Sequence, residues 1–146
     1  MKHLDLLGTP LKSEFLFDLL ETYDIQVVYE YDRTHENLPD EYHAEIPDLG
    51  LQFVFDENQM LRTLFIKPVE ITTFNPFEED ERVRRFTSKP EVRQHAKEND
   101  VPTSEGEANF IGEHRDWIRL ECDTHSVHYE FVDSALKMIT LQTTNA

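Results

Sequence analysis

Apolar side chains recur at helical spacing near the start of the chain. Four of them follow one another at intervals of four residues and two more widen the same stripe: Leu11, Phe15, Leu19 and Tyr23, with Leu16 and Leu20 beside them. Thr9 is a good capping residue, and Pro10 suits the first helical position, where its missing N–H costs nothing. The pattern predicts a helix from Pro10 to Tyr23 that packs through this stripe.

A second helix is predicted from Lys89 to Glu98, because Ser88 and Glu91 have the spacing of a capping box and Pro90 lies in the first turn. Elsewhere, apolar and polar residues alternate with a period of two, which is typical of half-buried strands. The predicted strands cover residues 25–31, 42–46, 51–56, 60–66, 69–74, 117–122, 126–131 and 136–142. Residues 99–112 are predicted to form a polar loop.

Short polar turns separate several of these strands, as at Asp56-Glu57-Asn58-Gln59 and Asp123-Thr124. Turns of this length favour hairpins and therefore an antiparallel sheet. The sequence predicts an α+β fold, with a mostly antiparallel sheet and two helices, in a single domain over residues 1–146. Each predicted helix precedes a group of strands, which leaves open an arrangement in two helix-plus-meander halves.

The composition adds a strong negative charge to this picture. The chain has 30 Asp and Glu against 14 Lys and Arg, a formal net charge of −16, whereas a charge of about 2–8 is enough to keep a small domain in solution. Such a surface repels nucleic acid and anionic membranes and attracts basic proteins. Ten Phe, five Tyr and one Trp supply a core, so the acids are expected to coat a folded protein.

Motifs for catalysis or metal binding are not found. Cys122 is the only cysteine, which excludes an intramolecular disulfide and a multi-cysteine zinc site. His125 and His128 would point to opposite faces of a strand. Neither a Gly-x-Ser-x-Gly elbow, a phosphate-binding glycine loop nor an EF-hand pattern is present. We therefore expect a binding protein that is not an enzyme and uses no cofactor.

The acids gather in clusters, of which residues 32–48 and 78–81 carry the most weight. Tyr42, flanked by acids, and Trp117, on the polar side of a predicted strand, have the form of aromatic anchors at an interface. Each of these residues also has a structural interpretation without a role in binding. The acids would then lie in ordinary solvated loops, and the aromatic residues would belong to the core. The predicted partner-binding set is Asp32, Glu36, Asp40, Glu41, Tyr42, Glu45, Glu78, Glu79, Asp80, Glu81 and Trp117.

Two stretches resemble a known class of protein: Gly50 to Ile66 (GLQFVFDENQMLRTLFI) and Asp116 to Leu141 (DWIRLECDTHSVHYEFVDSALKMITL). Hairpins of this style, in a small acidic α+β chain, are similar to those of the immunity proteins that bacteria encode beside polymorphic toxins, contact-dependent inhibition toxins and type VI effectors. The order of helices and strands is also similar to the β-lactamase-inhibitory-protein architecture, at the level of the fold alone.

The resemblance implies a protein that binds one cognate toxin and blocks its active site or an essential surface. Its acidity would suit a basic toxin such as a nuclease, and a homo-oligomer stays open. A cytoplasmic location is expected, because the sequence has neither a signal peptide nor an apolar run of membrane-spanning length. Two alternatives remain: a small enzyme or ligand-binding domain with a hidden pocket, and a regulatory subunit that pairs through a sheet edge.

Overall fold

The computed structural model of the chain describes residues 1–31, 37–70 and 73–144. The first half of this structure contains a short 3-10 helix η1 (His3–Leu6), helix α1 (Glu14–Thr22), strands β1 (Val28–Glu30) and β2 (Glu41–Ile46), a second 3-10 turn η2 (Pro47–Leu49), and strands β3 (Leu51–Phe55) and β4 (Leu61–Ile66). The second half contains helix α2 (Lys89–Glu98) and strands β5 (Thr103–Phe110), β6 (Glu113–Glu121), β7 (His125–Val132) and β8 (Ala135–Thr143).

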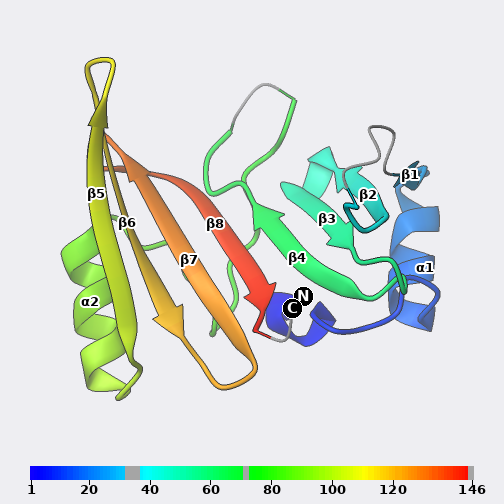
Figure 1. Cartoon of the computed structure of the whole chain (residues 1–146), viewed down its shortest axis with the longest axis horizontal. Helices are drawn as coiled ribbons and strands as arrows, with labels where there is room; N and C mark the ends of the chain where they lie inside the picture. Colours follow the sequence, from blue (N-terminus) through cyan, green and yellow to red (C-terminus); the bar gives the residue numbers. More distant parts are fainter. Residues whose placement is uncertain (32–36, 71–72, 145–146) are drawn as a thin grey trace.

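The described strands form one antiparallel sheet in the order β1-β2-β3-β4-β8-β7-β6-β5 (Figure 1). Each half is a helix followed by a meander, and the last strand of one half pairs with the last strand of the other. This β4–β8 junction runs from Thr63 opposite Gln142 to Ile66 opposite Ile139. The predicted α+β class is confirmed, and the chain is organised as two helix-plus-meander halves.

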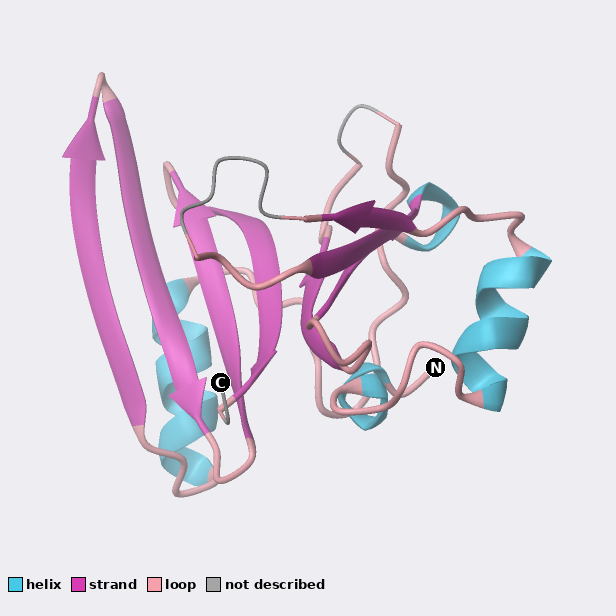
Figure 2. Ribbon diagram, turned by 45° about the vertical axis from the view of Figure 1, so that its right-hand side comes forward, coloured by secondary structure: helices cyan, strands magenta, loops and turns pink. Residues whose placement is uncertain are grey.

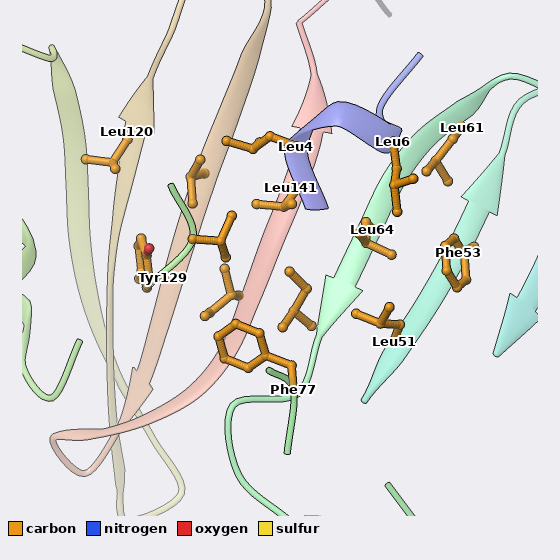
Figure 3. Close-up of a cluster of buried hydrophobic side chains, with 14 of the residues drawn as sticks. Leu4, Leu6, Leu51, Phe53, Leu61, Leu64, Phe77, Leu120, Tyr129 and Leu141 are labelled. Atoms are coloured by element: carbon orange, nitrogen blue, oxygen red, sulfur yellow. The ribbon is translucent and has the colours of Figure 1, made fainter. Parts of the chain in front are cut away.

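One face of the sheet carries the core. Apolar residues line up across strands from both halves in two rows: Ala44, Phe53, Leu64, Leu141, Val127 and Leu120, and beside them Ile46, Leu51, Ile66, Ile139, Tyr129 and Ile118. All twelve side chains are buried in a single apolar cluster. Leu4 and Leu6 of η1 and Phe77 of the segment before α2 cover these rows (Figure 3). The strands therefore alternate between an inner face and an outer face.

The two helices pack on this same inner face through matching positions. Helix α1 buries Leu16 and Leu20, and α2 buries Val92 and Ala96, in each case a pair separated by one helical turn. Figure 2 shows α2 behind the strands of the second half. Because both helices lie on the inner face, the outer face is left without a helical cover in the part of the chain that the structure describes.

The second helix has the bounds that the sequence predicts. Ser88 is its N-cap, and the Ser88 hydroxyl oxygen accepts a hydrogen bond of 3.3 Å from the backbone N–H of Glu91. The Glu91 carboxylate accepts a hydrogen bond from Thr87 rather than from the cap backbone. The start of α2 is thus fixed by residues within one turn of it, which is why local sequence predicts it.

The first helix begins later than predicted, at Glu14 with Ser13 as the N-cap. The hydroxyl of Thr9 donates to the Leu6 carbonyl oxygen and does not cap the helix. Pro10 instead bridges to Met60, because the chain before α1 runs beside the start of β4. The predicted stripe is also rotated, since Leu16 and Leu20 form its buried centre while the Phe15 side chain is 54% exposed.

Three further predictions are wrong in part. Residues 99–112 are not a loop, because most of them form β5, an edge strand whose polar residues are held by eight pairs with β6. The predicted strand over residues 69–74 includes two residues outside the described chain, and the remainder forms no strand. The predicted strand over residues 25–31 shortens to Val28–Glu30.

Candidate protein-binding face

The outer face of the sheet presents a second set of side chains in register. One row runs from Glu45 and Gln52 through Phe65, Thr140 and His128 to Arg119 and Ser104. Trp117, Glu130 and Met138 belong to the neighbouring row, in which Trp117 and Met138 lie on either side of Glu130. We call these outward-facing positions of β2–β8 the open face. In Figure 1 helix α2 lies behind β5 and β6, so the open face of these strands is turned toward the viewer.

Trp117 lies at the centre of the β5–β7 part of the open face. Its ring stacks on the His128 imidazole, with 5.3 Å between ring centroids and 18° between the planes. On the other side it lies over Gly106 of β5, where a Cβ atom would approach the indole to 2.9 Å. The Arg119 guanidinium carbon is 5.7 Å from the indole centroid. Strand neighbours on three sides therefore hold a half-buried indole in one orientation.

The ionised groups around Trp117 are paired with one another. Arg119 donates to the Glu121 carboxylate over 2.7 Å, and Arg115 contacts both Glu113 (3.1 Å) and Glu130 (3.6 Å). Hydrogen bonds from Ser104 and Arg119 hold the pKa of Glu121 below its ordinary value. Two arginines thus face three glutamates on β6 and β7. This part of the surface is close to neutral, although the chain as a whole carries −16.

His128 contributes an uncharged ring to this arrangement. Burial lowers its pKa below the ordinary value of 6.5, and the positive charge of Arg119 lowers it further, with Glu130 and Glu121 acting in the opposite direction. The neutral imidazole therefore predominates at pH 7 and stacks on Trp117 without a charge to desolvate. A neutral aromatic pair in a frame of ion pairs is the composition typical of a protein–protein contact.

The predicted acids of the first cluster are used mainly within the protein. Asp40 accepts a hydrogen bond of 2.6 Å from the Tyr29 hydroxyl, which together with burial raises the pKa of Tyr29 to about 12. Glu41 forms an ion pair of 2.6 Å with Arg62. The Tyr42 ring lies 5.0 Å from the Tyr29 ring at a tilt of 31° and packs against the core. Glu45 is exposed on the open face and accepts from Gln52. Asp32 and Glu36 lie outside the described residues.

The second acidic cluster lies in the segment that covers the inner face. Glu78 and Glu81 are exposed, and the Glu79 carboxylate accepts from the backbone N–H of Arg85. Asp80 is different, because four hydrogen-bond contacts surround its carboxylate, from the backbone and ring of His3 and from the backbone N–H groups of Arg82 and Val83. Asp80 fixes this segment onto η1.

The structure therefore does not bring the predicted partner-binding residues onto one surface. Trp117 and Glu45 share the open face but are separated by β3, β4, β8 and β7, while residues 78–81 are on the inner-face side. Sequence reasoning missed Phe65, His128, Thr140 and Met138. The outward-facing half of the strand alternation carries their signal, but only the strand order places them on one surface with Trp117.

Metal-ligating groups and cavities of the described chain offer no second candidate site. No group of three or more His, Cys, Asp or Glu side chains is placed to hold a metal ion among residues 1–31, 37–70 and 73–144. A cavity of about 340 Å³ lies between η1, the β3–β4 turn and His125, and Asp56 and Arg82 of its lining are engaged within the chain. Asp56 accepts from the turn backbone, and Arg82 pairs with Asp5.

Comparison of the chain with protein-family models, with curated protein sequences and with solved structures gave no match. None of the helices in the described part of the chain combines the length and the apolar character needed to cross a membrane.

Proposed function

We propose that the chain is a binding protein rather than an enzyme, and that it docks a basic protein on the open face of its sheet. In line with the resemblance noted in the sequence, the partner is proposed to be a cognate bacterial toxin whose active site or essential surface the chain blocks in the cytoplasm. The observation that carries the proposal is the Trp117 cluster, meaning Trp117 with Gly106, His128 and Arg119, an ordered aromatic centre on a sheet face that no helix of the described chain covers.

The charge distribution supports this choice of partner. The net charge of −16 attracts a basic protein over distances longer than any contact, which speeds association. Trp117 and His128, with ion pairs that need no outside partner, allow close packing without stranding a charge. The exposed acids thus provide the long-range electrostatic attraction, and the open face provides the short-range contacts with the partner.

The proposal is tested by purifying partners from the source organism with two baits, the wild-type chain and its Trp117→Ala variant. We expect the wild-type chain to retain one basic protein that the variant loses, and co-expression of the wild-type chain to suppress the toxicity of that protein. Retention of nothing, or equal retention by both baits, would contradict a role for the open face. An unaffected partner activity would contradict the role as an inhibitor.

The exposed acids are predicted to control the rate of association. In the variant Glu78→Gln, Glu79→Gln, Glu81→Gln, we expect the association rate constant at low salt to fall several-fold, up to about tenfold, while the dissociation rate constant stays within about twofold. Asp80 is left intact because it holds the fold, and the Glu79→Gln change keeps an oxygen acceptor for the backbone N–H of Arg85. Stopped-flow or surface-plasmon measurements at two salt concentrations provide the readout. An unchanged association rate and salt dependence would contradict electrostatic steering.

A further inference from the structure

The hairpin between β5 and β6 ends in two large apolar side chains that the fold does not bury. Phe110 is 67% exposed and Ile111 is 86% exposed, the highest values among the exposed large hydrophobic residues of the described chain. In Figures 1 and 2 this hairpin extends beyond the other strands of the sheet. Packing within the chain therefore does not explain why these two residues are apolar.

The backbone of the turn makes Ile111 more unusual. Phe110 pairs with Glu113, so the loop has two residues, Ile111 at φ 48° and Gly112 at φ 78°. Positive φ at both positions is the type I′ geometry, for which Asn-Gly is the favoured sequence. A β-branched side chain is disfavoured in this left-handed region. Ile111 thus opposes the local preference of the turn.

Other described residues with positive φ follow that preference. Apart from glycine, every one except Ile111 is polar: Asp24, Asn37, Gln59, Asp100, Asp133 and Ser134. The β7–β8 turn, also of two residues, uses Asp133 and Ser134 at φ 49° and 68°. Polar residues or glycine therefore occupy the other left-handed positions of the described chain, and the apolar tip of the β5–β6 hairpin is the exception.

The hairpin presents this tip on a firm base. The His114 ring lies 2.9 Å from the Asn109 side-chain oxygen across the strands. The backbone N–H of His114 donates to the Asp133 carboxylate over 3.0 Å, and the Asp133 N–H donates back to the His114 carbonyl over 2.7 Å. These contacts lie within a few residues of the tip. A preorganised tip loses little conformational entropy when it is bound.

We propose that Phe110 and Ile111 form a prong that inserts into an apolar cleft of a basic partner protein. This inference rests on the proposed function and specifies how the partner is held. Phe110 has the same strand parity as Gly106, so it extends the open face beyond the Trp117 cluster. Glu107 lies near the tip with a side chain that is 70% exposed; its carboxylate suits a basic rim around the cleft and opposes insertion into an anionic membrane.

The prong is tested by photo-crosslinking, with p-benzoylphenylalanine introduced singly at Phe110, at Trp117 and, as a control on α1, at Phe17. Adducts of one basic protein from positions 110 and 117, with none from position 17, would support both proposals. An adduct from 117 without one from 110 would overturn the prong and keep the proposed function. An adduct from 110 alone would support the prong and contradict the open face, and no adduct from either position would contradict both.

The strained turn allows a second test, which measures both the stability of the chain and its affinity for the basic protein captured by crosslinking. Ile111→Asn restores the favoured turn sequence, so we expect its melting temperature to rise by about 3 °C while its affinity for the captured protein falls at least tenfold. Gln59→Asn is the matched control, because it also places Asn at positive φ (63°), in the distant β3–β4 turn, and should leave the affinity unchanged. Unchanged affinity of the Ile111→Asn variant would overturn the prong. A second result would also overturn the prong: the wild-type chain binds phosphatidylglycerol vesicles and the Ile111→Asn variant does not. The hairpin tip would then bind a membrane and not a protein.

Discussion

Replacing Trp117 with alanine is expected to weaken partner binding by about 30-fold or more, the loss typical of an aromatic anchor worth at least about 2 kcal/mol. The indole is the largest side chain at the centre of the β5–β7 part of the open face, and its orientation is set by Gly106, His128 and Arg119. Truncation removes the apolar contact and leaves a depression between those neighbours. We expect the loss to appear mainly as faster dissociation.

Phe17→Ala is the matched control for this experiment. Phe17 is an aromatic residue with 50% of its surface exposed, but it lies on α1, away from the open face. Binding kinetics of both variants, measured beside thermal unfolding, separate lost contact from lost structure. Equal affinity of wild type and the Trp117→Ala variant, or an equal loss in the Phe17→Ala variant, would contradict the assignment of the open face.

Asp80→Ala is expected to lower the free energy of unfolding by about 3 kcal/mol at neutral pH. The Asp80 side chain is only 12% exposed, and its carboxylate makes contacts of 2.8–3.0 Å with His3, Arg82 and Val83. Removing the acceptor leaves partly buried donors unpaired, at a cost of about 1–3 kcal/mol for each group that water cannot reach. Chemical denaturation measures this difference. Glu81→Ala, an exposed neighbour, is expected to change it by less than about 0.5 kcal/mol.

The effect of Asp80→Ala is also expected to depend on pH. Burial raises the pKa of Asp80, but the hydrogen bonds from the backbone and ring of His3 and from the backbone of Arg82 and Val83 outweigh burial and lower the pKa below 3.8. The stabilisation is therefore complete above about pH 3.8 and is lost as the pH falls through the lowered value. The difference between wild type and variant should shrink in this acid range. A difference that is constant with pH would contradict an ionised carboxylate as its source.

Sequence predicts this fold best where neighbouring residues decide the structure. Helix α2 begins at Lys89 because Ser88 caps it, and β3 follows the alternation of Leu51 and Phe53. The sequence predicts too early a start for α1 because Thr9 and Pro10 carry local helix signals, whereas pairing with the distant residues 59–61 holds that segment extended. Strand β5 was missed because an edge strand with polar residues on both faces lacks an apolar period.

The candidate site was predictable only in part, for a physical reason. Trp117 could be selected because it is an aromatic residue on the polar side of a predicted strand, next to the apolar Ile118. Its neighbour His128 comes from β7, and Phe65, on β4, joins the same surface only through the β4–β8 junction. Acid content gives the sign of the long-range field but not the use of each carboxylate. Glu41 and Asp80 are engaged inside the protein, which the sequence does not reveal.

The central claim, that a partner covers the open face, is tested most directly by fluorine NMR of the chain labelled with 5-fluorotryptophan. Trp117 is the only tryptophan, so the labelled protein has one resonance, and an unlabelled partner adds none. Titration with the captured basic protein is expected to shift this resonance in proportion to the fraction bound. It is also expected to reduce the change in chemical shift between H2O and D2O, because the partner shields the indole from solvent. A complex that forms with the resonance unchanged would contradict the claim, because the partner would then be bound elsewhere on the chain.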